Sequence, residues 1–441
     1  MNGEESAPPP QRRSLVTNAA AAYATNLATA GLSLLNVLIV SRALGPAGRG
    51  DVAFLMTVAL LSAGVAAFGI QEANANLAGS EPRLRRALAG NSIAFGLVFG
   101  GAAAVAVLGL VAAFPAVGAD VSRTLLVLAA AAIPLLLTKQ YVTYLIQADY
   151  GFGVTNLAWL IGPLTSTSVN AALAATGRIT VGTAISAWIL GQVLGFVLLC
   201  WYVHRHAGFG PPRRDLARQS LGFGLKTHAG RFMAFGNYRV DQWFVGAMAG
   251  SRELGLYSIA VAWAELLFYL SGVLVMLQRP DLVRASPAEA GRRAARVLRI
   301  ALLLAVPACV GLVLAAPVLC VTLMGSAFGG SIDDLRILAL GAFGVVALDL
   351  LGNAMNAQRR PLRATAAIST AFVVTLALDI ALIPSLGGLG AAIATTVAWT
   401  VGGAAAIVLF TRAFPVKARD LVPRVSELPW LLQRLRGGSA A

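Results

Sequence analysis

Basic and amide side chains gather on one face of an apolar segment near residues 222–248. At the 100° per residue of an α-helix, four of them fall on one narrow arc: His228, Arg231, Arg239 and Gln242. A charge at the bilayer centre costs at least about 3 kcal/mol, so such groups are expected to face a water-filled cavity or a charged partner. The arc therefore predicts a cationic, polar helix face. The alternative is that Arg231 reaches the membrane surface and Arg239 pairs with an acid.

Carboxylates embedded in apolar segments could carry a coupling ion. The candidates are Asp241, Glu265, Asp349 and Asp379. A buried carboxylate without a neighbouring cation favours its protonated form, which suits proton exchange. Embedded bases, among them Lys139, roughly balance the embedded acids, so several of these groups must form structural ion pairs. The sequence does not rank the four acids, and it leaves open whether the coupling ion is H+ or Na+.

Uncharged polar residues form further stripes on apolar segments. The first segment carries one of them: Asn18, Thr25, Thr29, Ser33 and Asn36. Two smaller groups, one beside Lys139 and one beside Asp349, continue the pattern: Gln140 and Tyr144, and Asn353. These stripes predict the polar lining of an aqueous cavity. Hydrogen bonds between packed helices would give a similar pattern, so both interpretations stay open.

The elements that must position these residues are transmembrane helices. Of the 441 residues, 58% are hydrophobic and 12% are charged, a balance that excludes a water-facing globular fold. Apolar runs of about 20 residues recur along the chain and leave no room for a soluble domain. Cys200, Cys309 and Cys320 have no spacing typical of disulfides or metal sites, and we expect no cofactor or metal. The polar opening residues lack signal-peptide features, so the first helix is expected to remain as an anchor.

Twelve spans are predicted, which makes the expected fold an all-α polytopic membrane protein with two six-helix lobes. Apolar runs and turn signals place the spans at 16–41, 51–78, 88–113, 122–147, 154–176, 180–203, 222–248, 255–278, 294–323, 332–356, 363–384 and 387–411. Lys and Arg concentrate in the termini and the loops on the same side, which places both termini in the cytoplasm. The opposite loops hold only Arg42, Arg49, Arg123, Arg178 and Arg252. The net charge of +15 then reflects topology and attraction to anionic lipids, and nucleic-acid binding is not needed to explain it.

Weak internal repeats support the two lobes. Segment 47–53 aligns with 254–260, and 181–185 aligns with 389–393, each pair six spans apart. Two bundles of the same orientation are typical of alternating-access transporters. The predicted organisation is a cytoplasmic tail at 1–15, a first lobe at 16–203, a basic linker at 204–221, a second lobe at 222–411 and a basic, amphipathic cytoplasmic tail at 412–441. The last segment would suit a helix lying on the inner leaflet or a disordered tail.

Several short motifs resemble those of a known family in their order and spacing. They are Ser41 to Gly50, Ile146 to Ala148 with Phe152 and Asn156, Tyr238 to Asp241, Glu253 to Ser258, and Gly387 to Ala392. Together they resemble the polysaccharide flippases of the multidrug/oligosaccharidyl-lipid/polysaccharide (MOP) superfamily, the Wzx-like proteins. The resemblance covers residues 15–412.

This resemblance implies a transporter that carries an undecaprenyl-diphosphate-linked oligosaccharide outward across a bacterial inner membrane, by alternating access, for polysaccharide biosynthesis. A cationic cavity suits such cargo, because arginine can hold diphosphate oxygens bidentately while the lipid tail stays in the bilayer. The expected diphosphate contacts are Arg231 and Arg239, with His228, Gln242 and Lys139. The headgroup moves unaltered, so we expect no enzymatic activity. The expected partners are the lipid-linked oligosaccharide, membrane lipids, a polysaccharide polymerase and glycosyltransferases.

Other functions fit the same sequence. Within the same fold, the chain could be a drug or metabolite antiporter of the MATE type, or a lipid II flippase. Twelve spans instead of fourteen disfavour the lipid II flippase. A membrane-embedded glycan polymerase or ligase would be expected to carry acid, His or Arg residues on a large outward loop. The predicted outward connections are about ten residues or fewer, which favours transport.

Overall fold

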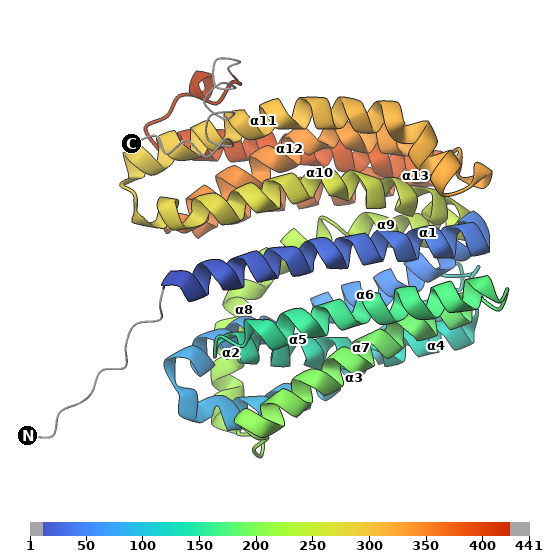
Figure 1. Cartoon of the computed structure of the whole chain (residues 1–441), viewed down its shortest axis with the longest axis horizontal. Coiled ribbons are helices and arrows are strands. Elements are labelled where there is room, and N and C mark those ends of the chain that lie inside the picture. Colours follow the sequence, from blue (N-terminus) through green and yellow to red (C-terminus); the bar gives the residue numbers. More distant parts are fainter. Residues whose placement is uncertain (1–11, 424–441) are drawn as a thin grey trace, which may run out of the picture. The chain divides into compact units, whose positions relative to one another are not determined.

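The computed structural model describes residues 12–423, with side chains from Ala24 onward except at six positions between 269 and 280. Every regular element in this part of the chain is a helix (Figure 1). The α-helices are α1 (Arg12–Val65), α2 (Ile70–Ser80), α3 (Arg85–Ala113), α4 (Arg123–Ala131), α5 (Ile133–Gln147), α6 (Phe152–Ala175), α7 (Val181–His206), α8 (Arg214–Gly236), α9 (Val240–Met248), α10 (Gly250–Arg284), α11 (Pro287–Pro317), α12 (Ser331–Ala357) and α13 (Pro361–Thr411). A π-helical turn at Val318–Leu323 continues α11.

The two longest helices each contain a sharp kink at a glycine. Gly45 in α1 has φ of 67°, and Gly387 in α13 has φ of 58°. A side chain strains this left-handed backbone conformation, whereas glycine adopts it without a steric penalty. Both kinks lie where the sequence predicts a boundary between two spans. The predicted connection at 42–50 is therefore a bend within a nearly continuous helix and not an open loop.

The predicted all-α membrane fold is confirmed, and its helices are approximately consistent with twelve crossings. Among the described residues, eight helices are long and apolar enough to cross a membrane. Two of these, α1 and α13, each supply two crossings once they are divided at their kinks. The remaining two predicted crossings correspond to the helix pair α8 and α9 and to the helix α10, which are not among these eight.

Two predicted spans are wrong in their continuity. The span at 51–78 is interrupted between α1 and α2, where Phe68 and Gly69 both have positive φ. The span at 222–248 is interrupted at 237–239, between α8 and α9. After a break, the next helix starts at a new rotation about its axis, so side chains before and after the break do not follow one 100° periodicity. The four residues of the predicted arc therefore do not lie on one continuous helix, and the 100° periodicity that groups Arg231 with Arg239 does not extend across the break.

The chain divides into two compact units, and each mixes segments that are distant in sequence. The first unit comprises residues up to Val40, Ser62–Leu108 and Val127–His228. The second unit comprises Ser41–Leu61, Gly109–Leu126 and the chain from Ala229 onward. Each unit therefore receives part of α1, and α8 passes from the first unit to the second after His228.

In the first unit, close helix approaches depend on small residues. Helix α7 packs against α6 and α5, and α5 packs against α2. A Cβ atom on Gly96 of α3 would lie 1.9 Å from the Thr138 hydroxyl oxygen. One on Gly191 of α7 would lie 2.6 Å from the Gly162 carbonyl oxygen. Small residues let helix backbones approach closely where lipid offers no hydrophobic driving force between helices.

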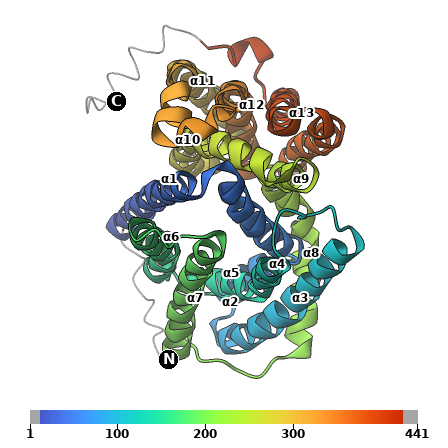
Figure 2. The same cartoon turned by 90° about the vertical axis from the view of Figure 1, so that its right-hand side faces the viewer.

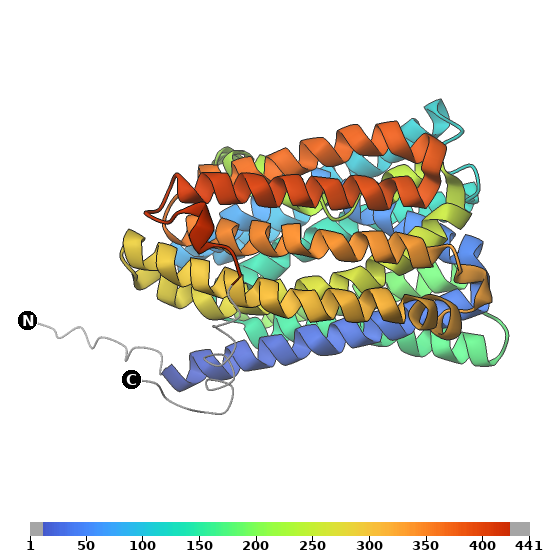
Figure 3. The same cartoon turned by 90° about the horizontal axis from the view of Figure 1, so that it is seen from above.

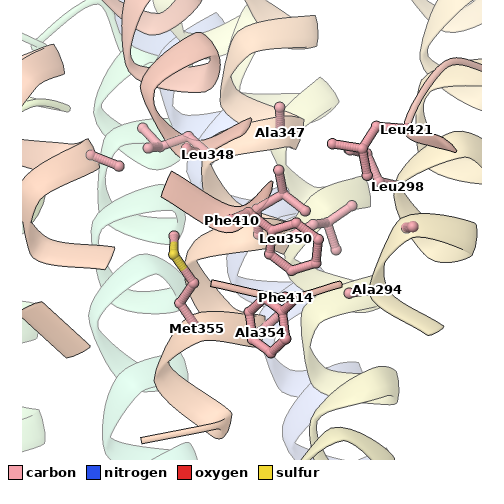
Figure 4. Close-up of a cluster of buried hydrophobic side chains, with 14 of the residues drawn as sticks. Ala294, Leu298, Ala347, Leu348, Leu350, Ala354, Met355, Phe410, Phe414 and Leu421 are labelled. Atoms are coloured by element: carbon pink, nitrogen blue, oxygen red, sulfur yellow. The ribbon is translucent and has the colours of Figure 1, made fainter. Parts of the chain in front are cut away.

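In the second unit, α12 lies between α11 and α13, and the three run side by side (Figures 1 and 3; Figure 2 views them end-on). Leu298 of α11, Leu350 of α12 and Phe410 of α13 form part of their buried core (Figure 4). The chain after α13 joins this core, because Phe414 and Leu421 are also buried there. The segment at 413–421 is thus packed against helices. The predicted tail beyond it, from 424 onward, lies outside the described residues.

Candidate functional site

The break between α8 and α9 places a polar turn inside the second unit. The Thr375 hydroxyl of α13 donates a hydrogen bond to the Asn237 side chain at 3.0 Å, which fixes the start of this turn. Arg239 then precedes α9 with non-helical backbone angles. Arg239 is the N-cap of α9, because its carbonyl accepts a helical hydrogen bond from the Trp243 N–H at 3.4 Å.

Arg239 forms an ion pair with Glu265 of α10, with 2.8 Å between guanidinium and carboxylate. The two side chains are 30% and 28% exposed, so this pair is not sealed from solvent. A second cation, Arg49 from the kinked part of α1, lies close enough for its charge to interact with that of Arg239. The Nε atom of Arg49 is buried and has no hydrogen-bond partner among the described residues. Two guanidinium groups therefore share one region of the second unit.

A pair of buried carboxylates lies in the same unit. Asp241 at the start of α9 accepts a hydrogen bond from the Tyr257 hydroxyl at 2.5 Å and from the Gln242 backbone N–H at 2.7 Å. Asp379 of α13 has no exposed surface, and neither of its oxygens has a hydrogen-bond partner among the described residues. The two acids are close enough to interact electrostatically.

The charge of Arg239 acts on Asp241 and offsets part of the repulsion between the two acids, but burial still disfavours two negative charges in this pair. A shared proton or a bound monovalent cation would resolve the conflict. The Thr395 hydroxyl, 3.3 Å from the Tyr257 hydroxyl, adds another oxygen to this region. No group of three or more His, Cys, Asp or Glu in the described part of the chain has the arrangement of a metal site. Carboxylate and hydroxyl oxygens such as these are ligands for hard cations, whereas soft metals prefer sulfur and imidazole.

Asp349 forms a further buried polar group. Its carboxylate accepts a hydrogen bond from Ser271 at 2.8 Å and another from Tyr238. A small cavity of about 10 Å³, close to the volume that one water molecule needs, is lined both by Tyr238 and by Glu265 of the Arg239 ion pair. Its polar lining is Tyr238, Asp241, Glu265 and Trp399. Tyr238 thus bonds to Asp349 and also lines the cavity that Glu265 reaches.

In the first unit, several predicted cavity residues form contacts between helices. The Lys139 ammonium donates to the Gln192 side chain at 2.8 Å, and Lys139 is only 9% exposed. The Asn170 amide donates to Asn36 at 2.8 Å, so the stripe on the first segment contributes to helix packing at Asn36. His228 lies with its ring 5.6 Å from that of Phe68.

The remaining predicted site residues occupy varied environments. Arg231 is exposed on the part of α8 that belongs to the second unit, and Gln242 is buried. Asn353 is buried, and its amide nitrogen has no hydrogen-bond partner in the described part of the chain. Partly or fully exposed are Thr25, Thr29, Ser33, Gln140 and Tyr144. The side chain of Asn18 lies outside those that are described. The aqueous lining role of this group stays a prediction.

The sequence interpretation missed three residues of this region: Arg49, Tyr238 and Tyr257. The sequence predicts a loop at Arg49, because the residues around Gly45 have the pattern of the end of a span. Both tyrosines lie within the short motifs that resemble the flippase family. Tyr238 is next to Arg239 and Tyr257 is near Glu253, so these motifs could have indicated both residues. Their hydrogen bonds to Asp349 and Asp241 join residues from separate spans, so sequence spacing alone could not reveal them.

Comparisons with known proteins agree with this architecture. Residues 39–333 match a family model described as polysaccharide biosynthesis protein. No curated protein matches the chain. Among solved structures, the chain is similar to lipid II flippase MurJ in an inward closed conformation, with a TM-score of 0.73 and 16% identity over 95% of this chain and 93% of that one.

Two MOP-superfamily transporters are also similar. One is a multidrug resistance MATE family transporter in an inward-facing conformation, with a TM-score of 0.63 and 16% identity over 93% of this chain and 96% of that one. Another, from Pyrococcus furiosus, has a TM-score of 0.57 and 14% identity over 90% of this chain and 94% of that one. At these identities the likenesses establish the fold, and the predicted resemblance to the MOP superfamily is confirmed.

Proposed function

Because the chain belongs to the polysaccharide biosynthesis protein family, we propose that it flips an undecaprenyl-diphosphate-linked oligosaccharide from the cytoplasmic to the outer leaflet of a bacterial inner membrane. The family match and the fold make the chain a multi-pass membrane flippase or transporter. The substrate, the membrane and the direction of transport are the proposed part. Both termini would lie in the cytoplasm, as the Lys and Arg distribution indicates.

The observation that carries this proposal is the proximity of Arg49 and Arg239 inside a membrane-spanning unit. Two like charges in a poorly solvated region repel each other, and an anion between them would remove that cost. Guanidinium groups are well matched to phosphate oxygens, because each can donate two parallel hydrogen bonds. The partial exposure of the Arg239 ion pair leaves a route by which a diphosphate could exchange with Glu265.

Ion coupling is the second part of the proposal. Asp241 and Asp379 would hold the coupling ion, H+ or Na+, because a buried pair of acids needs a positive partner. Asp349 and Glu265 are further candidates for binding the coupling ion. The transported headgroup needs no bond to be made or broken, so we propose transport without catalysis. A polysaccharide polymerase and glycosyltransferases are the proposed neighbours in the pathway.

A polysaccharide export assay tests the arginine site. Arg49→Ala and Arg239→Ala are each expected to lower surface polymer about tenfold or more at normal protein levels, because a hydrogen bond to a charged group contributes about 1.5–3 kcal/mol. Arg49→Lys is expected to restore only part of the activity, since lysine keeps the charge but not the planar fork. The control is Arg252→Ala, which removes an exposed arginine near the start of α10. Normal polymer in both alanine variants would remove these arginines from the mechanism.

Deleting the gene for this chain in a polymer-producing strain separates the rival functions. A drug antiporter of the same fold would leave surface polymer unchanged on deletion and would alter drug resistance. A lipid II flippase would be needed for peptidoglycan synthesis rather than for the polymer. Accumulation of lipid-linked oligosaccharide on the cytoplasmic side in the deletion strain is the result expected from our proposal.

A further inference from the structure

An apolar groove runs along the first unit between α3, α5 and α7. Its volume is about 800 Å³, within the range of small-molecule binding sites. Its lining includes Leu97, Pro134, Phe196, Cys200, Phe209 and Pro212. All three helices belong to candidate membrane spans, so the groove faces hydrocarbon rather than water over most of its length.

The groove walls offer almost no polar contact. Thr138 is the only residue of the lining with a hydroxyl group, and it donates to the Pro134 carbonyl at 2.6 Å within its own helix. Leu97 is 61% exposed and has no protein partner over most of its surface. A hydrocarbon chain is therefore the occupant that matches the walls, since it needs no hydrogen bonds and gains dispersion contacts.

One end of the groove is closed by the segment after α7, which is tied to the start of α3. The Gly210 backbone N–H donates to the Arg86 carbonyl at 2.8 Å. Asn91 and Arg213 exchange two hydrogen bonds, of 3.1 and 2.8 Å, between side chain and backbone. These bonds hold Gly210 against α3 so closely that a Cβ atom on Gly90 would lie 2.0 Å from the Gly210 carbonyl oxygen.

A cation lies at this end. The Arg86 side chain passes beside Gly208 and Gly210, and it is exposed. It makes no ion pair or side-chain hydrogen bond with the described residues. The acids nearby are used by other arginines, in the pairs Arg83 with Glu81 at 2.9 Å and Arg85 with Asp149 at 2.7 Å. Arg86 thus remains available for an anion at the mouth of an apolar groove.

We propose that this groove binds an anionic phospholipid, with one acyl chain along α3 and α7 and its phosphate on Arg86. A phospholipid fits better than the transported lipid, because the cation lies at the mouth and the lining itself holds none. A lipid bound in this way keeps its headgroup at the surface of one leaflet. It would act as a resident lipid of the first unit, and the proposal does not depend on the identity of the cargo.

Native mass spectrometry of the delipidated full chain tests the headgroup contact. Phosphatidylglycerol is expected to bind about fivefold more tightly than phosphatidylcholine, the effect of one basic residue near a membrane surface. Arg86→Ala is expected to remove this preference, whereas the control Arg83→Ala, on an arginine already paired with Glu81, retains it. Equal binding of the two lipids, or equal loss in both variants, would overturn the proposal. Tighter binding of a polyprenyl phosphate than of phosphatidylglycerol would also overturn it.

A second measurement locates the lipid. Cys200 lines the groove, so bound phosphatidylglycerol is expected to slow its alkylation by N-ethylmaleimide, measured on the peptide that contains it. Ala94→Trp should fill the groove and abolish lipid binding, and Ala102→Trp, at an exposed position of α3 outside the groove, should not. An unchanged alkylation rate with lipid bound would place the lipid elsewhere and refute the proposed site.

Discussion

At the scale of single residues, Asp379 is the side chain least explained by folding alone. It is fully buried, lacks hydrogen-bond partners among the described residues and lies near a second acid, Asp241. A carboxylate in this position costs free energy unless a proton or cation accompanies it. A bound ion would remove the free-energy cost of burying this carboxylate, so an ion-binding role explains its presence in the fold.

Replacing this carboxylate by an amide is therefore expected to leave the fold intact. Asp379→Asn should preserve or raise the free energy of unfolding, by up to about 3 kcal/mol in the absence of a coupling ion, because it removes an uncompensated charge. Thermal unfolding in detergent, measured with and without added NaCl at constant ionic strength, checks this. A large fall in melting temperature would show that the carboxylate is structural.

The Arg239–Glu265 ion pair offers a second distinction between structure and function. Because both side chains are partly exposed, the pair is expected to contribute only about 1 kcal/mol or less to folding. Glu265→Gln and Arg239→Ala should therefore have similar, small effects on thermal stability. They should differ in export: loss of Arg239 should lower it about tenfold or more, whereas loss of Glu265 should reduce it less. Equal export defects in the two variants would favour a purely structural pair.

At the scale of helices, two glycines hold separate elements of the second unit in backbone contact. A Cβ atom on Gly50 of α1 would lie 1.7 Å from the Ser251 carbonyl oxygen of α10, and one on Gly255 would lie 1.9 Å from the Pro46 carbonyl oxygen. Backbone atoms cannot turn aside as a flexible side chain can. The contact joins the two segments, 47–53 and 254–260, that the internal repeat predicts to be equivalent.

Gly50→Ala is expected to lower the melting temperature and the yield of folded protein, with a cost of about 1–3 kcal/mol for the forced separation of the helices. The control is Gly101→Ala in α3, where no atom lies within 4 Å of the added carbon. Alanine there should stabilise by up to about 1 kcal/mol, because it favours a helix more than glycine does. Comparable stability of both variants would mean that the Gly50 contact is loose in solution.

The sequence predicts helices well and their interruptions poorly. Long apolar runs determine where a chain can cross a membrane, so most helices lie where spans are predicted, and both glycine kinks lie at predicted span boundaries. The break at 237–239 is not predicted, although Gly236 and Asn237 form a dipeptide common in turns, because apolar residues continue on both sides of it. Its cause is tertiary: Asn237 is held by Thr375 from a distant helix. The proximity of Asp241 to Asp379 also arises from the tertiary structure, and no local sequence pattern predicts it.

At the scale of the whole molecule, the two units carry different polar chemistry. Within the second unit lie the two interacting arginines and the buried acids Asp241, Asp349 and Asp379. The first unit has Lys139 bonded to Gln192 and polar contacts between helices. The residues predicted as one diphosphate site are thus divided, with Lys139 and His228 in the first unit and Arg231, Arg239 and Gln242 in the second. Substrate and ion chemistry would both centre on the second unit.

This division predicts how transport responds to ion gradients. In proteoliposomes loaded with a fluorescent lipid-linked oligosaccharide, flipping should slow severalfold when an ionophore collapses the gradient of the coupling ion, H+ or Na+. Asp379→Asn should flip at a rate that neither ionophore changes, because the ion has lost its site while the arginines remain. Lys139→Ala, in the first unit, should keep its ionophore response. If Asp379→Asn still responds to the ionophore as the unmodified protein does, the coupling ion binds elsewhere, and Asp349 becomes the next carboxylate to replace.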